Sequence, residues 1–286
     1  MRVTVGCAQF APRKAEVAIN LDTLADRVVQ ASREGCDLVV FPETATSGYF
    51  LEGGVLESAL APGTLLEELY RRLRGCLQSP IDAVVGFYEK ADGHLYNSAA
   101  YLELGLEGGR VLHVYRKFFL PTYGVFDEER FVSRGRDLGV FDTRFGRVGM
   151  LICEDVWHSI LPTLTALSGA QVLIVPSASP ARGFSGDDIE NHDRYRRMMR
   201  AVSEEHGIYS LNVQLCGFEG GKGFIGGSLV IDPWGRVVGE SPVVEEHLLV
   251  AEMDLDLIAV ARAGSPLLGD LRSAWSDIKR LVVAID

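Results

Sequence analysis

The fold of this chain is decided by the stretch Val148-Gly149-Met150-Leu151-Ile152-Cys153-Glu154-Asp155. Its unbroken run of small and β-branched apolar residues predicts a buried strand. A helical pattern follows from residue 157 to residue 168, which places Cys153 at a strand-to-helix turn. A turn of this kind presents a nucleophile and directs backbone N–H groups at the atom that it attacks. The stretch therefore predicts an α/β fold with a thiol at the end of one strand.

Two other apolar runs end in a single ionisable residue. Residues 38–42 lead to Glu43, and residues 111–116 lead to Lys117. A thiol is a weak nucleophile near neutral pH, because its unperturbed pKa is about 8.5, and it needs a base or a cation beside it. Each residue alone is usually a core, capping or solvated residue. Their repetition at three strand ends favours a catalytic set of carboxylate, amine and thiol.

Strands and helices alternate along the whole chain, with hairpins between them. This order predicts mixed sheets covered by helices. We find no linker and no repeat, so we expect a single domain over residues 1–286. The strands are expected at 3–9, 38–41, 83–88, 97–103, 111–116, 172–175, 208–213, 227–231 and 248–253, and further helices at 20–34, 64–76 and 188–205.

The bulk composition excludes several classes of partner. A formal net charge of −11 argues against nucleic acid and anionic membrane surfaces. No stretch approaches the roughly 20 apolar residues of a membrane span. The N-terminus reads as a first strand and not as a signal peptide.

The five cysteines of the chain are widely spaced. They form no CxxC pair and no zinc pattern with histidine, so we expect neither a metal nor a cofactor. Reduced thiols of this kind are typical of a cytoplasmic protein.

Three blocks of sequence resemble the signatures of the nitrilase superfamily, the carbon–nitrogen hydrolases. They are Phe41-Pro42-Glu43, residues 116–121 around Lys117, and residues 151–155 around Cys153, in the order of that family. The resemblance implies a four-layer αββα sandwich with a Glu-Lys-Cys triad at strand ends. It also implies a core over about residues 3–258 with a C-terminal extension at 259–286, and pairing into homodimers or larger assemblies.

One branch of that superfamily is particularly similar. Residues 120–131, 153–157 and 177–180 resemble the glutaminase domain of glutamine-dependent NAD synthetases. This resemblance implies that Tyr49, Tyr123 and Ser179 line the substrate site. It implies that Glu128 is a second glutamate that positions Lys117 and the substrate; the alternative is that residues 127–129 form a solvated acidic run. No ATP-pyrophosphatase loop of the Ser-Gly-Gly-x-Asp-Ser type accompanies these blocks.

The expected mechanism follows from the residue types. Cys153 attacks an amide carbon, and Glu43 takes its proton and passes it to the leaving nitrogen. Lys117 and the backbone N–H of Glu154 hold the oxyanion, and Glu154 is also an expected substrate contact. Asp155 is expected to cap the following helix and not to take part in the chemistry.

The sequence leads us to expect a cysteine-dependent, glutaminase-like or ω-amidase-like enzyme that cleaves a small-molecule amide through a thioester. Two alternatives stay open within the same chemistry. One is an N-carbamoyl or β-ureido acid amidohydrolase, and the other is a glutaminase subunit that supplies ammonia to a separate synthetase. A subunit that keeps the fold without catalysis is a further alternative, against which the complete triad argues.

Overall fold

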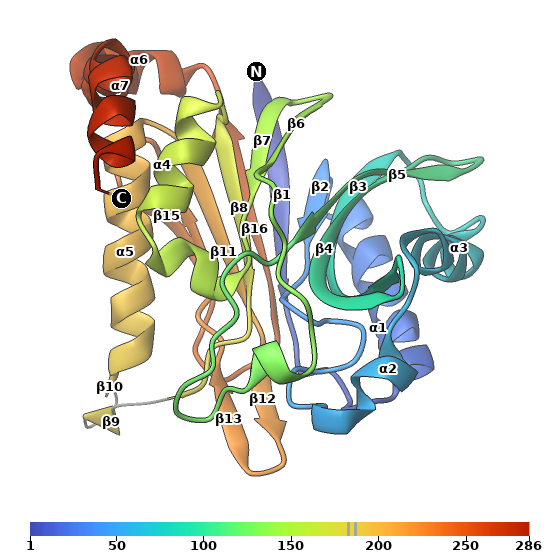
Figure 1. Cartoon of the computed structure of the whole chain (residues 1–286). Helices are drawn as coiled ribbons and strands as arrows, with labels where there is room; N and C mark the ends of the chain where they lie inside the picture. The colour runs from blue at the N-terminus through green and yellow to red at the C-terminus, as the bar shows by residue number, and fades with distance from the viewer. Residues whose placement is uncertain (182–183, 186–187, 286) are drawn as a thin grey trace.

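Two six-stranded sheets stack face to face in the computed structural model, which describes residues 1–181, 184–185 and 188–285 (Figure 1). The first sheet has the order β16 (His247–Asp254), β1 (Arg2–Gln9), β2 (Leu38–Val40), β3 (Ile81–Ala91), β4 (His94–Leu104) and β5 (Gly109–Arg116). The second has the order β15 (Val237–Glu240), β14 (Leu229–Ile231), β11 (Tyr209–Gln214), β8 (Val172–Ser177), β7 (Gly146–Met150) and β6 (Gly139–Thr143). Both sheets mix parallel and antiparallel pairs.

Helices cover the outer face of each sheet. Helices α1 (Val17–Arg33) and α3 (Pro62–Leu73) pack on the first sheet, whereas α4 (Ile160–Leu167) and α5 (Glu190–His206) lie on the second (Figure 1). The predicted four-layer αββα sandwich is therefore confirmed.

The strands of the first sheet bury both of their faces because side chains alternate with a period of two. Val3 and Val5 of β1 point into the core between the sheets, and Ala8 packs under the helices. The helices match this surface with their own period. In α1, Leu21, Leu24, Val28 and Ala31 are buried, which is the face that the sequence predicted.

The helix predicted over residues 157–168 is present as α4, and it begins three residues later, at Ile160. It is preceded by a short 3₁₀ helix, η3 (Cys153–Trp157), that the sequence did not predict. His158 has an extended backbone and separates the two. The thiol therefore lies on a turn between strand β7 and helix α4, as the sequence predicted.

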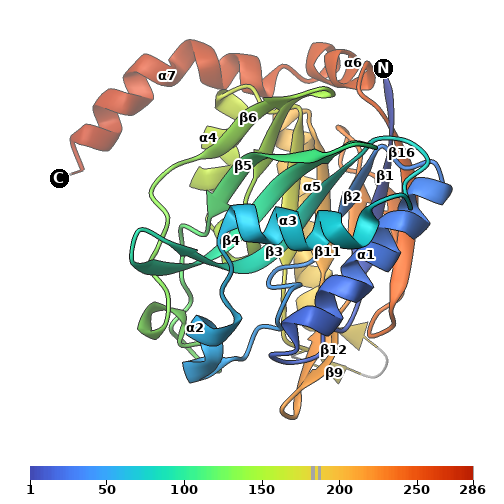
Figure 2. The same ribbon diagram turned by 90° about the vertical axis from the view of Figure 1, so that its right-hand side faces the viewer.

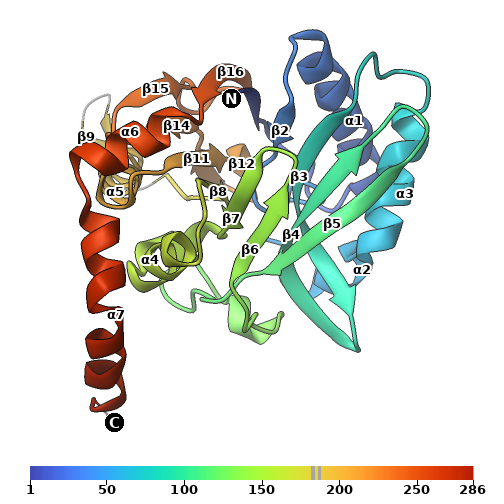
Figure 3. The same cartoon turned by 90° about the horizontal axis from the view of Figure 1, so that it is seen from above.

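The remaining elements flank the sandwich. Short segments η1 (Glu52–Gly54), α2 (Val55–Ser58) and η2 (Glu128–Arg130) lie in loops, and strands β9 (Phe184–Ser185) and β10 (Asp188–Ile189) and hairpin β12 (Cys216–Glu219)–β13 (Lys222–Ile225) extend from one end. Helix α6 (Leu257–Gly264) packs on the body through Ile258 and Ala261. Helix α7 (Leu267–Val283) projects away from it (Figures 2 and 3). Over the described residues, no helix has the length and apolar character needed to cross a membrane.

Candidate active site

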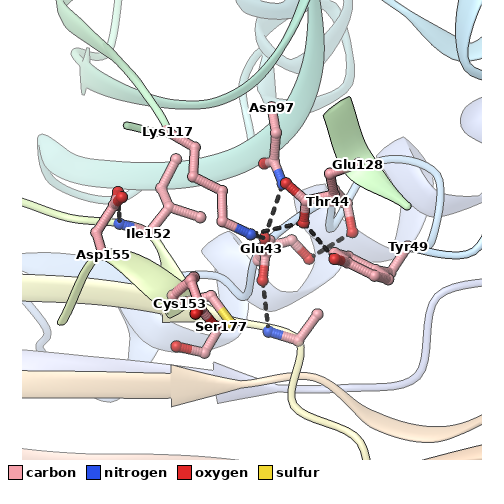
Figure 4. Close-up of polar contacts among 12 residues, drawn as sticks. Glu43, Thr44, Tyr49, Asn97, Lys117, Glu128, Ile152, Cys153, Asp155 and Ser177 are labelled. Carbon is pink, nitrogen blue, oxygen red and sulfur yellow. Dashed lines mark hydrogen bonds and ion pairs between the residues drawn. The ribbon is translucent and has the colours of Figure 1, made fainter. Parts of the chain in front are cut away.

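Three strand ends converge between the sheets. Glu43 follows β2 and Lys117 follows β5 in the first sheet, whereas Cys153 follows β7 in the second (Figure 4). The side chains of Glu43 and Lys117 are fully buried, and Cys153 is 7% exposed. The structure therefore brings together the three residues that the sequence selected at strand ends.

Lys117 connects two carboxylates. Its Nζ donates to Oε1 of Glu43 at 2.7 Å and to Oε1 of Glu128 at 2.6 Å. These two carboxylates raise the pKa of Lys117 against the opposing effect of burial. The amine is therefore a cation in the resting site, and one of its three N–H donors is left for a third acceptor.

The carboxylate of Glu43 has two further donors that the sequence analysis did not identify. The Nδ2 of Asn97 donates to Oε1 at 2.7 Å, and the backbone N–H of Ala178 donates to Oε2 at 2.8 Å (Figure 4). Asn97 lies on β4 and Ala178 follows β8, so the two donors come from different sheets. A polar residue at the start of the expected strand 97–103 is the signal that could have pointed to Asn97.

Cys153 adopts a backbone conformation that non-glycine residues rarely take. Its φ is +46°, and Thr44, which follows Glu43, has a φ of +50°. Burial, followed by the charge of Glu43, raises the pKa of the thiol, whereas Lys117 acts in the opposite direction. The resting sulfur therefore carries its proton, and a base must remove it for attack.

A phenol from α5 reaches the thiol. The hydroxyl of Tyr195 lies 3.3 Å from Sγ of Cys153, and the ring of Trp157 packs edge-on against Tyr195. The sequence analysis missed Tyr195, because a helical pattern does not show which of its residues will contact a turn that is distant in the chain.

Glu128 is buried, and the alternative of a solvated acidic run is wrong for this residue. Its carboxylate accepts from Lys117 and from the hydroxyl of Tyr49, whereas Asp127 and Glu129 are exposed. Burial raises the pKa of Glu128 to about 7, against the effect of Lys117. Tyr49, which was expected at the substrate site, therefore contacts the carboxylate of Glu128, which in turn binds the amine of Lys117.

Asp155 is not the N-cap residue that the sequence predicted, because Ile152 is the N-cap of η3 and Ser159 is that of α4. It lies inside η3, and its carboxylate accepts from the backbone N–H groups of Ile152, Phe118 and Phe119 and from the hydroxyl of Tyr115. Burial raises its pKa to about 6, and these donors counteract the rise. Asp155 therefore joins the turn of the thiol to the segment that follows Lys117.

The other expected substrate contacts lie around Cys153. Tyr123 is 51% exposed, and its hydroxyl donates to the carboxylate of Glu154 at 2.9 Å. The side chain of Glu154 is 15% exposed. Ser179 is buried, and its Oγ has no hydrogen-bond partner. The three side chains differ in exposure: Tyr123 is exposed, Glu154 is mostly buried and Ser179 is buried.

A cavity of about 400 Å³ adjoins the site at Glu128 and Tyr49. Its wall is mainly aromatic and aliphatic, with Phe126 and Phe131 among the lining side chains. Tyr49 and Glu128 belong to its lining, whereas Cys153 does not. In the part of the chain that the structure describes, no three histidine, cysteine or acidic side chains converge as a metal site.

Comparison with known proteins identifies the family. A model of the carbon–nitrogen hydrolase family matches residues 4–263. The chain is 30% identical over 262 residues to a glutamine-dependent NAD(+) synthetase of Thermotoga maritima, across 89% of this chain and 42% of that protein. It is 28% identical to an N-carbamoylputrescine amidase of Solanum tuberosum, across 99% of this chain and 96% of that protein. The chain thus spans less than half the length of the NAD synthetases that it matches.

Solved structures match the same fold. The glutamine-dependent NAD+ synthetase of Acinetobacter baumannii superposes with a TM-score of 0.77 at 26% identity, over 90% of this chain and 47% of that chain. An amidase of the nitrilase superfamily from Nesterenkonia AN1 superposes with a TM-score of 0.72 at 26% identity, over 96% and 97% of the two chains. This chain therefore belongs to the carbon–nitrogen hydrolase family.

Proposed function

We propose that the chain hydrolyses the terminal amide of a small molecule and releases ammonia through a thioester on Cys153. The observation that carries the proposal is the arrangement around Glu43. Its Oε1 is held by Lys117 and Asn97, and its Oε2 accepts from Ala178 beside the strained cysteine. A fixed carboxylate next to a protonated thiol is suited to act as a general base.

In the first step, Sγ of Cys153 forms a bond to the amide carbon while Glu43 takes the thiol proton. The negative charge moves to the amide oxygen. The remaining N–H donor of Lys117 and the backbone N–H of Glu154 stabilise this oxyanion. Lys117 needs no reorganisation for this role, because Glu43 and Glu128 already hold its Nζ.

In the second step, Glu43 gives its proton to the nitrogen, the carbon–nitrogen bond breaks and ammonia leaves. A water molecule then attacks the thioester, and Glu43 takes a proton from the water. The bond to sulfur breaks, Cys153 recovers its proton and the carboxylic acid is released. The balance is one water consumed for one ammonia and one acid formed.

The carboxylate of Glu154, the residue that follows the nucleophile, favours a substrate that carries an ammonium group. The carboxylate of Glu154 is partly exposed beside the hydroxyl of Tyr123. A carboxylate in this position attracts a cation. Tyr49 and Ser179 complete the proposed substrate contacts, and the unpartnered Oγ of Ser179 is available to a polar substrate atom.

A second candidate is the hydrolysis of an N-carbamoyl amine or N-carbamoyl acid. The observation in its favour is the length of the match to the Solanum tuberosum amidase, which extends over nearly all of both chains. N-Carbamoylputrescine also carries an ammonium group, so the carboxylate of Glu154 fits both candidates. They differ in the acyl group on Cys153, which is a carbamoyl group in this second case.

We further propose a physical partner. Because the synthetases contain more than twice the length that this chain matches, ammonia supply to a separate synthetase is the third candidate. A second copy of the chain is the other expected partner, since Leu281, Val282 and Val283 of α7 are more than half exposed. The five free thiols support a reducing, cytoplasmic location.

The test is ammonia release from a panel of glutamine, short aliphatic ω-amides, N-carbamoyl amines and N-carbamoyl amino acids. We compare the wild type with Cys153→Ala and with Cys76→Ala, which removes an exposed thiol outside the site. We expect Cys153→Ala to lose turnover and Cys76→Ala to keep it. Retention of most activity by Cys153→Ala would refute the mechanism. Release from N-carbamoyl compounds alone would select the second candidate, and stimulation only by an added synthetase the third.

A further inference from the structure

Asn97 is bonded to two members of the triad at once. Its side-chain Nδ2 donates to Oε1 of Glu43 at 2.7 Å, and its backbone carbonyl accepts from the N–H of Lys117 at 2.9 Å. Asn97 is fully buried in β4, where it pairs with Tyr88 of β3. One residue therefore determines the place of both the carboxylate and the first residue after β5.

The orientation of the Asn97 amide is fixed by charge. Its Oδ1 is buried and has no hydrogen-bond partner. Rotation of the amide by half a turn would give Oδ1 no donor at Glu43 either, because an ionised carboxylate only accepts. The amide therefore faces Glu43 with its NH₂ group, at the cost of leaving its own carbonyl without a partner.

The two oxygens of Glu43 have different surroundings. Oε1 accepts from both Asn97 and Lys117, whereas Oε2 accepts from the backbone N–H of Ala178. Ala178 follows β8, which pairs with β7, the strand that leads to Cys153, so Oε2 is the oxygen on the side of the thiol (Figure 4). With two donors, Oε1 is engaged, and Oε2 keeps a lone pair for a proton.

We propose that Asn97 is a positioning residue that reserves Oε2 of Glu43 as the oxygen that takes the proton of Cys153. The inference rests on the proposed role of Glu43 as the base. An asparagine suits this task because it donates without charge. A basic residue here would weaken the base, and an acidic one would compete with it for the proton.

Three variants test the proposal. Asn97→Leu keeps the approximate size and removes the donor. Asn97→Asp keeps the shape and donates only while it is protonated. Ser98→Ala is the control, because the buried Oγ of the adjacent residue donates to Glu89 and not to Glu43. We measure kcat and KM from pH 5 to 9 on the best amide of the panel, together with thermal unfolding and the activity of Cys153→Ala.

Asn97→Leu should lower kcat by about 10-fold to 100-fold, the scale of one hydrogen bond to a charged group, with KM changed by less than about 3-fold. Its acid limb of kcat/KM should move to higher pH, because the carboxylate has lost a donor. The titratable groups that face Glu43 are Lys117, Glu128, Cys153, Tyr49 and Tyr88. None of them is altered in these variants.

Asn97→Asp should gain an additional alkaline limb, because ionisation of the new carboxyl removes the donor. A structural role alone would lower activity equally at all pH values and would leave the limbs in place. That outcome, or a wild-type kcat in Asn97→Leu, overturns the inference. If Asn97→Leu does not fold, the pH profile of Asn97→Asp decides. An active Cys153→Ala would instead overturn the proposed function itself.

Discussion

The hydroxyl of Tyr195 lies 3.3 Å from Sγ of Cys153, and both groups are buried. The contact joins helix α5 to the turn that carries the thiol. Burial, followed by the proximity of Cys153, raises the pKa of Tyr195, so the phenol remains a donor through the neutral range. A donor at this position stabilises negative charge on the sulfur as the proton leaves.

Replacement of Tyr195 by Phe should slow formation of the thiolate. We expect kcat to fall by about 3-fold to 10-fold, the value of one hydrogen bond of about 1 kcal/mol. The rate of alkylation of Cys153 by iodoacetamide should fall with it. Tyr209→Phe is the control, because its hydroxyl bonds to the backbone carbonyl of Asp254. Equal alkylation rates in both variants would contradict a role for Tyr195.

Protonation of Glu128 should make the stability of the protein depend on pH. Its pKa is raised to about 7 by burial, so the folded state binds a proton more tightly than the unfolded chain does. The free energy of unfolding should therefore fall as the pH rises from about 4.5 to 7, by on the order of 1 to 3 kcal/mol. Glu128→Gln should flatten this part of the curve in urea unfolding, and the exposed neighbour Glu129→Gln should not. An unchanged slope in Glu128→Gln would argue against the shift.

Asp155→Asn should lower both stability and activity. The carboxylate accepts four hydrogen bonds, and an amide oxygen with a donor NH₂ beside it cannot replace them all. We expect a loss of about 3 kcal/mol, because buried N–H groups lose their acceptor. Asp142→Asn is the control, since its pair with Arg147 is exposed and contributes little. Similar melting temperatures for the two variants would refute the structural role of Asp155.

Gly86→Ala should displace the backbone of Glu43 while the catalytic side chain itself is kept. A Cβ at Gly86 would lie 2.7 Å from Cα of Glu43 and 2.7 Å from the N of Thr44, both of them backbone atoms. We expect a destabilisation of about 3 kcal/mol and a lower kcat, because the backbone of the catalytic strand end must shift. Gly63→Ala in α3, where nothing lies within 4 Å, should be neutral or slightly stabilising. Thermal unfolding and kcat of the two variants check this, and a Gly86→Ala enzyme with wild-type values would contradict it.

The strand-end positions of Glu43, Lys117 and Cys153 could be predicted because they depend on local patterns, whereas the four layers were implied by the family resemblance. An apolar run that ends in an ionisable residue is visible within a few residues of sequence. Asn97, Ala178 and Tyr195 were not identified, because their contacts join strands and helices that are distant in the chain. The packing of the two sheets decides those contacts, and no periodicity encodes it.

The predicted helix after Cys153 begins at Ile160, three residues later than expected, because a separate turn precedes it. In that turn, the carboxylate of Asp155 accepts from Ile152 and from the segment after Lys117. Tertiary hydrogen bonds thus hold η3 as a separate turn, against the local preference. The same carboxylate explains why the thiol keeps a strained φ, since its neighbours are fixed on both sides.

The origin of the triad in two different sheets has a consequence for folding. Glu43 and Lys117 end strands of the first sheet, and Cys153 follows a strand of the second. A folding intermediate with one sheet complete has no catalytic centre, however native its secondary structure is. Recovery of turnover during refolding should therefore coincide with docking of the sheets, after the far-ultraviolet circular dichroism signal has returned. The recovery of turnover is therefore a direct measure of the docking of the two sheets.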